Sequence, residues 1–261
     1  VITKSEELSN KGERAIIDIA EARMKSVMGA LKREVEKQIL TNSSTILSNL
    51  NTFNGLTDAD GGGVTGGNAN SGFFDNVAFG SQTATSIGGL SKVTFPRLNN
   101  QFVDAADSLD VSKMTDLYIQ CQLNTPDGSA PDLILCSPLF YKAYKGVLFN
   151  QERFVDEKVL DGGRLALAFN GAMVCATPFL GADVQANAAA PPDNNGIISA
   201  YFLNTKYMKI AFDAAAQFEM EDFESVSGYA SRSANIYTRM QVYFTHLASQ
   251  GVMTDAESPK P

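Results

Sequence analysis

The chain contains a single histidine, His246, and nothing in the sequence pairs it with a catalytic partner. It lies in the run Tyr-Phe-Thr-His-Leu at 243–247, and the sequence has no G-x-S-x-G segment that could supply an activated serine. One histidine also excludes a histidine-based metal cluster within a single chain. We therefore interpret His246 as a structural residue whose replacement affects stability alone.

Two loop segments contain residue types that bind phosphate or cations, but both lack the rest of the site. The glycine-rich run 61–67 is not followed by Gly-Lys-Ser/Thr, which a phosphate-binding loop needs. The segment 58–61 resembles half of a calcium loop, yet Gly62 and Ala69 stand where a third acidic residue and the closing glutamate belong. The sequence predicts no catalytic, cofactor-binding or metal-ligating residue, and no enzymatic activity.

The densest acidic segment is Phe218–Glu224. Two carboxylates could perform acid–base chemistry, but adjacent residues on a strand point to opposite faces. Two interpretations stay open: a solvated charged face, or a salt-bridged contact with a neighbouring subunit. Basic residues on a long N-terminal helix would supply the partners in the second case. The candidate subunit-contact residues are Arg14, Arg23, Arg33, Glu219, Glu221 and Glu224.

Composition excludes several classes of protein. The net charge of −8 disfavours a sequence-independent nucleic-acid binder, which would neutralise phosphates with a basic face. The three cysteines (Cys121, Cys136 and Cys175) are odd in number and have no CxxC spacing, so we expect free buried thiols. No stretch approaches the roughly 18 apolar residues of a membrane helix. The chain begins at Val1 without a signal segment, so we expect that it was processed or lacks upstream sequence.

The first long element that we expect is a helix from Lys11 to about Thr41. Asn10 is its candidate N-cap and Glu13 completes a capping box. At 1.5 Å per residue this helix is about 45 Å long. One apolar stripe follows it at steps of three and four residues: Ile17, Ala20, Met24, Val27, Leu31, Val35 and Ile39.

The rest of the sequence alternates helices with short strands, which indicates an α+β domain rather than a regular βαβ series. Residues 57–89 contain a long loop rich in Gly, Ser, Thr and Asn, which cannot order itself alone. We expect helices at Asp107–Leu123 and Leu139–Leu148, strands at Leu133–Cys136, Ala200–Phe212 and Asn235–Leu247, and a hairpin around Asn170-Gly171.

Five segments, taken in order, resemble the major capsid proteins of tailed bacteriophages, which are built on the Hong Kong 97 fold. The opening, Asn10 to Arg23, is similar to the N-x-G-x-x-A…E-A-R start of the spine helix in one branch of that family. No single segment is diagnostic, but their order and spacing span nearly the whole chain. The segments are Leu8–Arg23, Ile87–Leu90, Pro131–Ser137 with Gln151–Phe154, Leu167–Val174 and Tyr201–Tyr207.

The resemblance implies an α+β, Hong Kong 97-like capsid fold with a long spine helix, a peripheral β-sheet and a mixed α/β axial lobe. Residues 1–10 would be the remnant of an extended loop or N-terminal arm. Residues 11–56 and 216–258 would form the peripheral domain from the spine helix and the C-terminal long strands. Residues 57–215 would form the axial domain.

By the same resemblance, the chain would be a structural subunit of an icosahedral phage head. It would assemble in the host bacterial cytoplasm into pentamers and hexamers that enclose double-stranded DNA without sequence-specific binding. Portal, scaffold and decoration proteins are possible partners, and no membrane is expected. An acidic wall suits DNA packaging, because a basic wall would bind the genome tightly. The alternatives are an encapsulin-type nanocompartment shell, an unrecognised cytosolic hydrolase and a secreted adhesion module.

Overall fold

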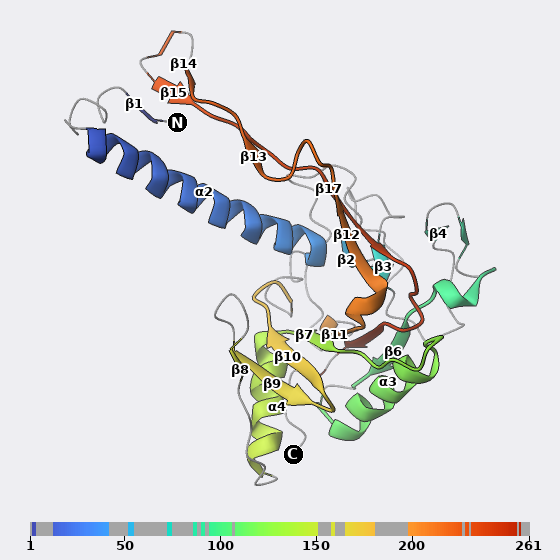
Figure 1. Ribbon diagram of the computed structural model, residues 1–261. Helices are drawn as coiled ribbons and strands as arrows, with labels where there is room; N and C mark the ends of the chain where they lie inside the picture. The colour runs from blue at the N-terminus through green and yellow to red at the C-terminus, as the bar shows by residue number, and fades with distance from the viewer. Residues whose placement is uncertain are drawn as a thin grey trace. The chain divides into compact units, whose positions relative to one another are not determined.

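The computed structural model describes residues 2–3, 13–41, 52–54, 72–74, 86–87, 90–91, 94–105, 108–150, 158–159, 165–180, 198–225, 228–229, 231–254 and 256 (Figure 1). The chain divides into two compact units. Unit 1 comprises Val1–Lys37 and Ile210–Gln241, and unit 2 comprises Gln38–Lys209 and Val242–Pro261.

Unit 2 is built on a mixed seven-stranded sheet with the strand order β6-β18-β11-β7-β10-β9-β8. Two neighbouring pairs, β6 with β18 and β7 with β10, are parallel, and the other pairs are antiparallel. The expected α+β class is therefore confirmed in its coarse form. The strands are β6 (Gln101–Asp104), β7 (Leu133–Cys136), β8 (Lys158–Val159), β9 (Leu165–Phe169), β10 (Ala172–Ala176), β11 (Ile198–Leu203) and β18 (Gly251–Thr254).

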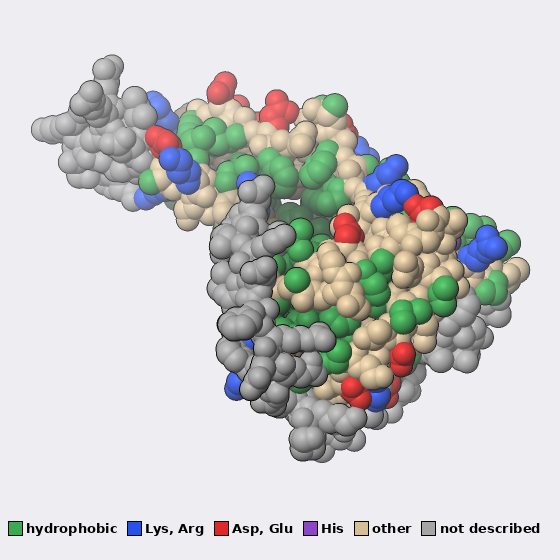
Figure 2. All heavy atoms as spheres, turned by 60° about the horizontal axis from the view of Figure 1, so that its bottom comes forward, with side chains coloured by type: hydrophobic (Ala, Val, Ile, Leu, Met, Phe, Trp, Pro, Cys, Tyr) green, Lys and Arg blue, Asp and Glu red, His purple; other side chains and the backbone are tan. Residues whose placement is uncertain are grey.

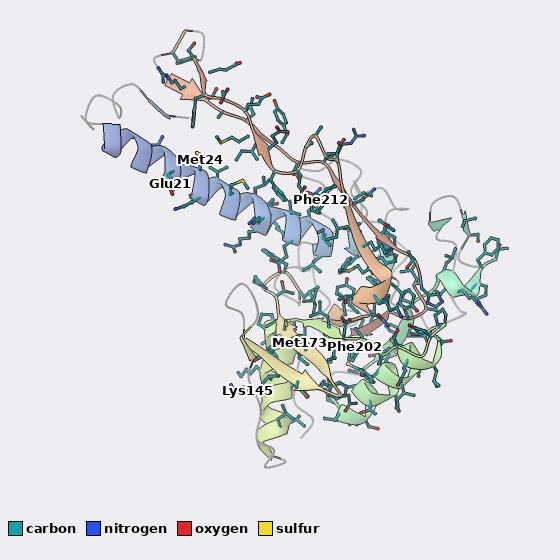
Figure 3. All side chains as sticks on the ribbon, in the orientation of Figure 1. Glu21, Met24, Lys145, Met173, Phe202 and Phe212 are labelled. Atoms are coloured by element: carbon teal, nitrogen blue, oxygen red, sulfur yellow. The ribbon has the colours of Figure 1, made fainter. Side chains whose placement is uncertain are left out.

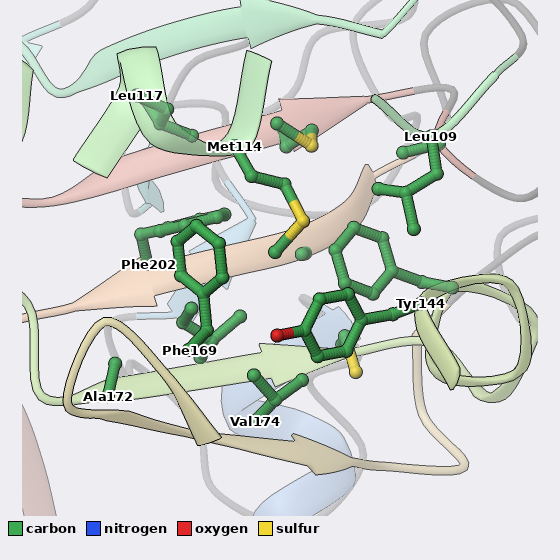
Figure 4. Packing of buried hydrophobic residues seen from close by; sticks show 14 of the residues in the cluster. Leu109, Met114, Leu117, Tyr144, Phe169, Ala172, Val174 and Phe202 are labelled. Carbon is green, nitrogen blue, oxygen red and sulfur yellow. The ribbon is translucent and has the colours of Figure 1, made fainter. Parts of the chain in front are cut away.

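Helices α3 (Val111–Leu123) and α4 (Pro138–Asn150) pack on one face of this sheet. Val174, Ile134 and Phe202 lie in one row of paired residues, so their side chains point to the same face. All three belong to one buried cluster with residues of both helices (Figure 4). α3 contacts β6 and β18, and α4 contacts β10 and β11.

Local sequence signals set where both helices begin. The Asp110 side chain accepts a hydrogen bond from the Ser112 backbone N–H at 2.9 Å. The expected helix at 107–123 therefore starts four residues later than predicted, because Asp110 caps it. The Ser137 hydroxyl accepts from the Phe140 N–H at 3.1 Å, and Pro138 fills the first helical position, where its missing N–H has no cost.

The opposite face of the sheet is covered at β11 by aromatic side chains. Tyr201 lies 5.6 Å from Phe53 on β2 (Thr52–Asn54) and 5.2 Å from Phe74 on β3 (Gly72–Phe74), measured between ring centroids. β2 and β3 pair in parallel. Phe244 packs against both phenylalanines, and burial raises the pKa of the Tyr201 hydroxyl. These rings bring segments distant in sequence onto one sheet face.

The predicted hairpin is confirmed at β9 and β10. Asn170 and Gly171 connect the strands with positive φ angles of 48° and 92°. A two-residue turn with two positive φ values is the type I′ geometry that Asn-Gly favours. Four further short elements of unit 2 are β4 (Ser86–Ile87), β5 (Leu90–Ser91) and the 3₁₀ turns η1 (Pro96–Leu98) and η2 (Thr205–Tyr207).

Unit 1 contains most of α2 (Glu13–Thr41), the long helix that the sequence predicts. Glu21 and Lys25 form an i,i+4 ion pair at 2.6 Å (Figure 3 labels Glu21). The expectation that Val27, Leu31 and Val35 form one buried stripe is wrong at Val27, which is 52% exposed, whereas Val35 is 7% exposed. At about 100° per residue, Val27 lies about 80° around the axis from Val35 and falls at the margin of the stripe.

The strands that lie wholly in unit 1 are short and form two sheets. β1 (Ile2–Thr3), β15 (Ser231–Ser233) and β14 (Glu224–Ser225) form a three-stranded sheet in the order β1-β15-β14. β13 (Glu219–Met220) pairs with β16 (Ile236–Tyr237). A further two-stranded sheet joins β12 (Met208–Phe212) to β17 (Met240–Phe244).

Two long strands that the sequence predicts are interrupted. The expected strand 200–212 stops at Leu203, and Asn204 caps the η2 turn before β12 begins. The expected strand 235–247 is divided into β16 and β17 because its partner changes. Next to this break, the Arg239 N–H donates to the Ala216 carbonyl at 2.8 Å, and the Asp213 N–H donates to the Arg239 carbonyl at 3.0 Å.

The two units divide the chain at other positions than the expected domains, because residues 38–56 and 242–258 belong to unit 2 and residues 210–215 to unit 1. Residues 251–254, which we grouped with a peripheral domain, form β18 and pair with β6 and β11 inside unit 2. The assignment of residues 1–10 to an extended loop stays a prediction. The glycine run 61–67 and the acidic segment 58–61 lie outside the described residues.

Close packing of α3 on β18 gives a prediction at Gly251. A Cβ atom there would lie 2.8 Å from the Cys121 Sγ and 2.9 Å from the Leu117 Cδ1. Gly251→Ala should lower the free energy of unfolding by about 1–3 kcal/mol, because overpacking displaces core atoms. Gly146→Ala is the matched control, because Gly146 lies in α4 and a Cβ atom at this position would have no other atom within 4 Å. Urea unfolding should show that Gly146→Ala raises stability by about 0.5–1 kcal/mol, and equal effects of both would refute the close approach.

Candidate functional site

The described residues contain no group of three or more His, Cys, Asp or Glu side chains positioned for a metal ion. Cys121, Cys136 and Cys175 are buried thiols. Burial raises the pKa of Cys121 and of Cys136 far above the range of a reactive thiolate. Within the described part of the chain, no helix is both long and apolar enough to cross a membrane.

His246 lies in a partly buried polar corner of unit 2. Its ring centroid is 5.6 Å from that of Tyr207, and its Nδ1 is buried without a hydrogen-bond partner in the structure. Burial lowers the pKa of His246, the nearby Arg97 lowers it further, and Asp127 opposes the shift. A structural role for His246 stays our interpretation.

A polar cluster beside His246 is the main feature that sequence reasoning missed. Asp127 forms an ion pair with Lys206, accepts a hydrogen bond from the Tyr207 hydroxyl at 2.7 Å and accepts another from the Ser129 hydroxyl at 2.8 Å. The Lys206 ammonium and then the Tyr207 and Ser129 donors hold the pKa of Asp127 well below its usual value. The cluster ties the loop between α3 and β7 to η2.

Two further contacts hold η2 from either side. The Asp132 carboxylate accepts from the Thr205 backbone N–H at 2.7 Å and from the Thr205 hydroxyl. The Gln250 side chain accepts from the Asn204 N–H at 2.7 Å and donates to the Asn204 carbonyl at 3.2 Å. Asn204 is the local signal for this turn, because asparagine side chains satisfy the backbone of a cap. The side chains that bind η2, those of Gln250, Asp132 and Asp127, lie 46 to 80 residues away in the sequence, so no local pattern predicts these contacts.

The predicted subunit-contact residues lie in unit 1. Glu219 on β13, Glu224 on β14 and Glu221 between these two strands are exposed, and the Asn235 side-chain amide donates to the Glu221 carboxylate at 3.3 Å. Arg33 is exposed on α2 and Arg23 is partly exposed, whereas the side chain of Arg14 lies outside the described residues. The five positions other than Arg14 are at least partly exposed, and the role of all six in subunit contacts stays a prediction.

Both units also expose large apolar side chains. Leu123 at the end of α3 is 77% exposed, and Tyr229 in unit 1 is 76% exposed. Figure 2 shows hydrophobic side chains gathered in patches on the face that it displays. Exposed apolar patches are typical of surfaces that contact other molecules. Besides Leu123 and Tyr229, the large apolar side chains that are exposed belong to Val27, Leu90, Phe95, Ile119, Leu139, Met173, Ile210, Phe212, Phe223, Tyr237 and Tyr243.

Comparison with known proteins identifies the fold. No family model matches the chain, and no curated protein sequence matches it. A solved structure of the holo-SrpI encapsulin complex from Synechococcus elongatus is similar, with a TM-score of 0.58 over 98% of this chain and 71% of that chain. The chain has a capsid-like fold. At 9% sequence identity the likeness shows the fold alone.

The Asp127 cluster predicts how stability depends on pH. The folded pKa of Asp127 is below the value of about 3.9 in an unfolded chain, so its stabilisation is complete above pH 4. That stabilisation should disappear as the pH falls through the folded pKa. Thermal unfolding between pH 7 and pH 2 should show a smaller acid-dependent loss for Asp127→Asn and for Lys206→Met than for the wild type. Identical pH profiles for all three proteins would show that the cluster does not couple protons to folding.

Proposed function

We propose that this chain is the structural subunit of a self-assembling protein shell. The observation that carries the proposal is the likeness to an encapsulin over nearly the whole chain. The likeness covers 98% of this chain, so it includes both units rather than the sheet of unit 2 alone.

The surface of the chain supports the same proposal. A shell subunit buries a core of its own and also presents surfaces that its neighbours cover. The sheet of unit 2 and its two helices provide the core, with side chains such as Met114, Ile134 and Phe202 fully buried. The exposed apolar side chains of both units are the surfaces that would be covered.

The finer proposal is the head of a tailed phage. The Asn10–Arg23 opening, which resembles the spine-helix start of phage capsid proteins, favours it. The shell would consist of pentamers and hexamers in the Hong Kong 97 arrangement and would enclose double-stranded DNA. A net charge of −8 suits a container from which DNA must be released. Assembly would take place in the host bacterial cytoplasm, and the subunit would have no enzymatic role.

The second candidate is an encapsulin-type nanocompartment shell. The structural neighbour favours it, because that protein is itself an encapsulin. The two candidates predict different contents for the same kind of particle: a phage head encloses DNA, and a nanocompartment encloses protein.

Purification from the native source tests both the general and the finer proposal. Negative-stain electron microscopy should show closed particles. Treatment with nuclease before opening the particles, followed by analysis of the released contents, should then recover protected DNA for a phage head. A specific protein cargo without protected DNA would select the nanocompartment. Small particles alone would refute both candidates.

Arg33 gives a prediction about assembly. Because Arg33 is exposed, Arg33→Glu should leave the unfolding midpoint unchanged. If Arg33 faces acidic groups of an adjacent subunit, this reversal should slow shell formation measured by light scattering, and more strongly at low salt. Lys32→Glu is the matched control, with the same charge change on another face of α2. Equal assembly of Arg33→Glu and wild type at low ionic strength would show that Arg33 makes no contact with an adjacent subunit.

A further inference from the structure

The outer surfaces of α3 and α4 carry complementary groups in unit 2. On α3, Asp116, Ile119 and Leu123 lie at steps of three and four residues, and all three are exposed. They therefore form one line on the side of the helix opposite Leu117 and Cys121, which are buried. The outer line of α3 thus consists of one carboxylate followed by two apolar side chains.

The outer surface of α4 has the opposite charge. Leu139 and Lys142 are exposed three residues apart, and α4 contains no acidic residue. Lys145 also lies on this helix (Figure 3). Neither Asp116 nor Lys142 forms an ion pair with any residue that the structure describes. The outer line of α3 therefore presents the acidic Asp116 beside apolar side chains, whereas the exposed surface of α4 presents the basic Lys142 beside Leu139.

We propose that the outer line of α3 on one copy of the chain docks against the outer surface of α4 on a neighbouring copy. Asp116 would lie opposite Lys142, and Ile119 and Leu123 would cover Leu139. The contact joins two different surfaces, so it is heterologous and can extend from copy to copy into a ring. The proposal deepens the proposed function, because it names the surface through which one shell subunit contacts the next.

A second copy of the chain is the occupant that the observations favour. The complementary charge and apolar side chains are present on the same chain, so each copy supplies both halves of the contact. The patch is also small, with two large apolar side chains on α3. A standard stable interface buries about 800 Å² per partner. Such a contact is weak for an isolated pair and becomes effective when a closed assembly repeats it.

Cross-linking between two single-cysteine variants tests the contact directly. Copies with Asp116→Cys are mixed with copies with Lys142→Cys and treated with a short bismaleimide. The native cysteines are buried, so wild type provides a low background. We expect covalent dimers in the mixture and none in either variant alone. Dimers formed by Asp116→Cys alone would indicate an α3–α3 contact and overturn the proposal, as would a mixture without dimers.

Charge reversal provides a second, independent measurement. Asp116→Lys and Lys142→Asp should each weaken self-association in sedimentation experiments at low salt by about tenfold, because like charges would then face each other. The double variant should restore association to within about twofold of wild type, since it re-forms the pair with exchanged signs. Gln122→Lys is the control for added charge on α3, because Gln122 is exposed and lies about 120° around the helix axis from Asp116. Single variants that associate like wild type, or a double variant weaker than either single, would overturn the contact.

The two proposals fail in different ways. Closed particles in the electron microscope without cross-links between positions 116 and 142 would leave the shell function standing and refute this contact. Cross-links in the mixture together with open oligomers that never close would support the contact and refute the shell function.

Discussion

The insertion of β18 between β6 and β11 is the constraint on which the rest of unit 2 depends. This strand pairs in parallel with β6 and antiparallel with β11, so it joins the edge of the sheet to its centre. Gly251 allows α3 to approach the sheet closely enough for Leu117 and Cys121 to be fully buried. Without β18, the edge strand β6 would lose its pairing partner in the sheet, and α3 would lose part of the surface on which it packs.

The same arrangement determines which surfaces remain for other molecules. Once the inner sides of α3 and α4 are buried in one core, their outer sides are the exposed parts of the helical layer. Polar contacts, by contrast, hold the loops that connect the strands and helices. The Gln250 side chain, for example, accepts a hydrogen bond from the Asn204 backbone N–H and donates one to the Asn204 carbonyl. A rigid core with fixed loops and exposed apolar side chains suits a subunit that packs against copies of itself.

Sequence patterns predict the elements whose signals are local. The strand Leu133–Cys136 has the predicted bounds, and Asn170-Gly171 forms the predicted turn because the backbone preference of two residues determines it. The break at Asn204 and the partner change at Arg239 depend on distant segments, so the apolar pattern there resembles one continuous strand. β18 is four residues long and was missed as part of the central sheet. The Asp127 cluster was missed because its partners Lys206 and Tyr207 are almost 80 residues away.

Cryo-electron microscopy of the purified particles tests the central claim, that this chain is the subunit of a protein shell, most directly. The account predicts closed icosahedral particles in which every repeating unit of density contains the seven-stranded sheet of unit 2 with α3 and α4 on one face. Protein that remains as single copies at every concentration and salt condition, with no repeating lattice of subunits, would contradict it.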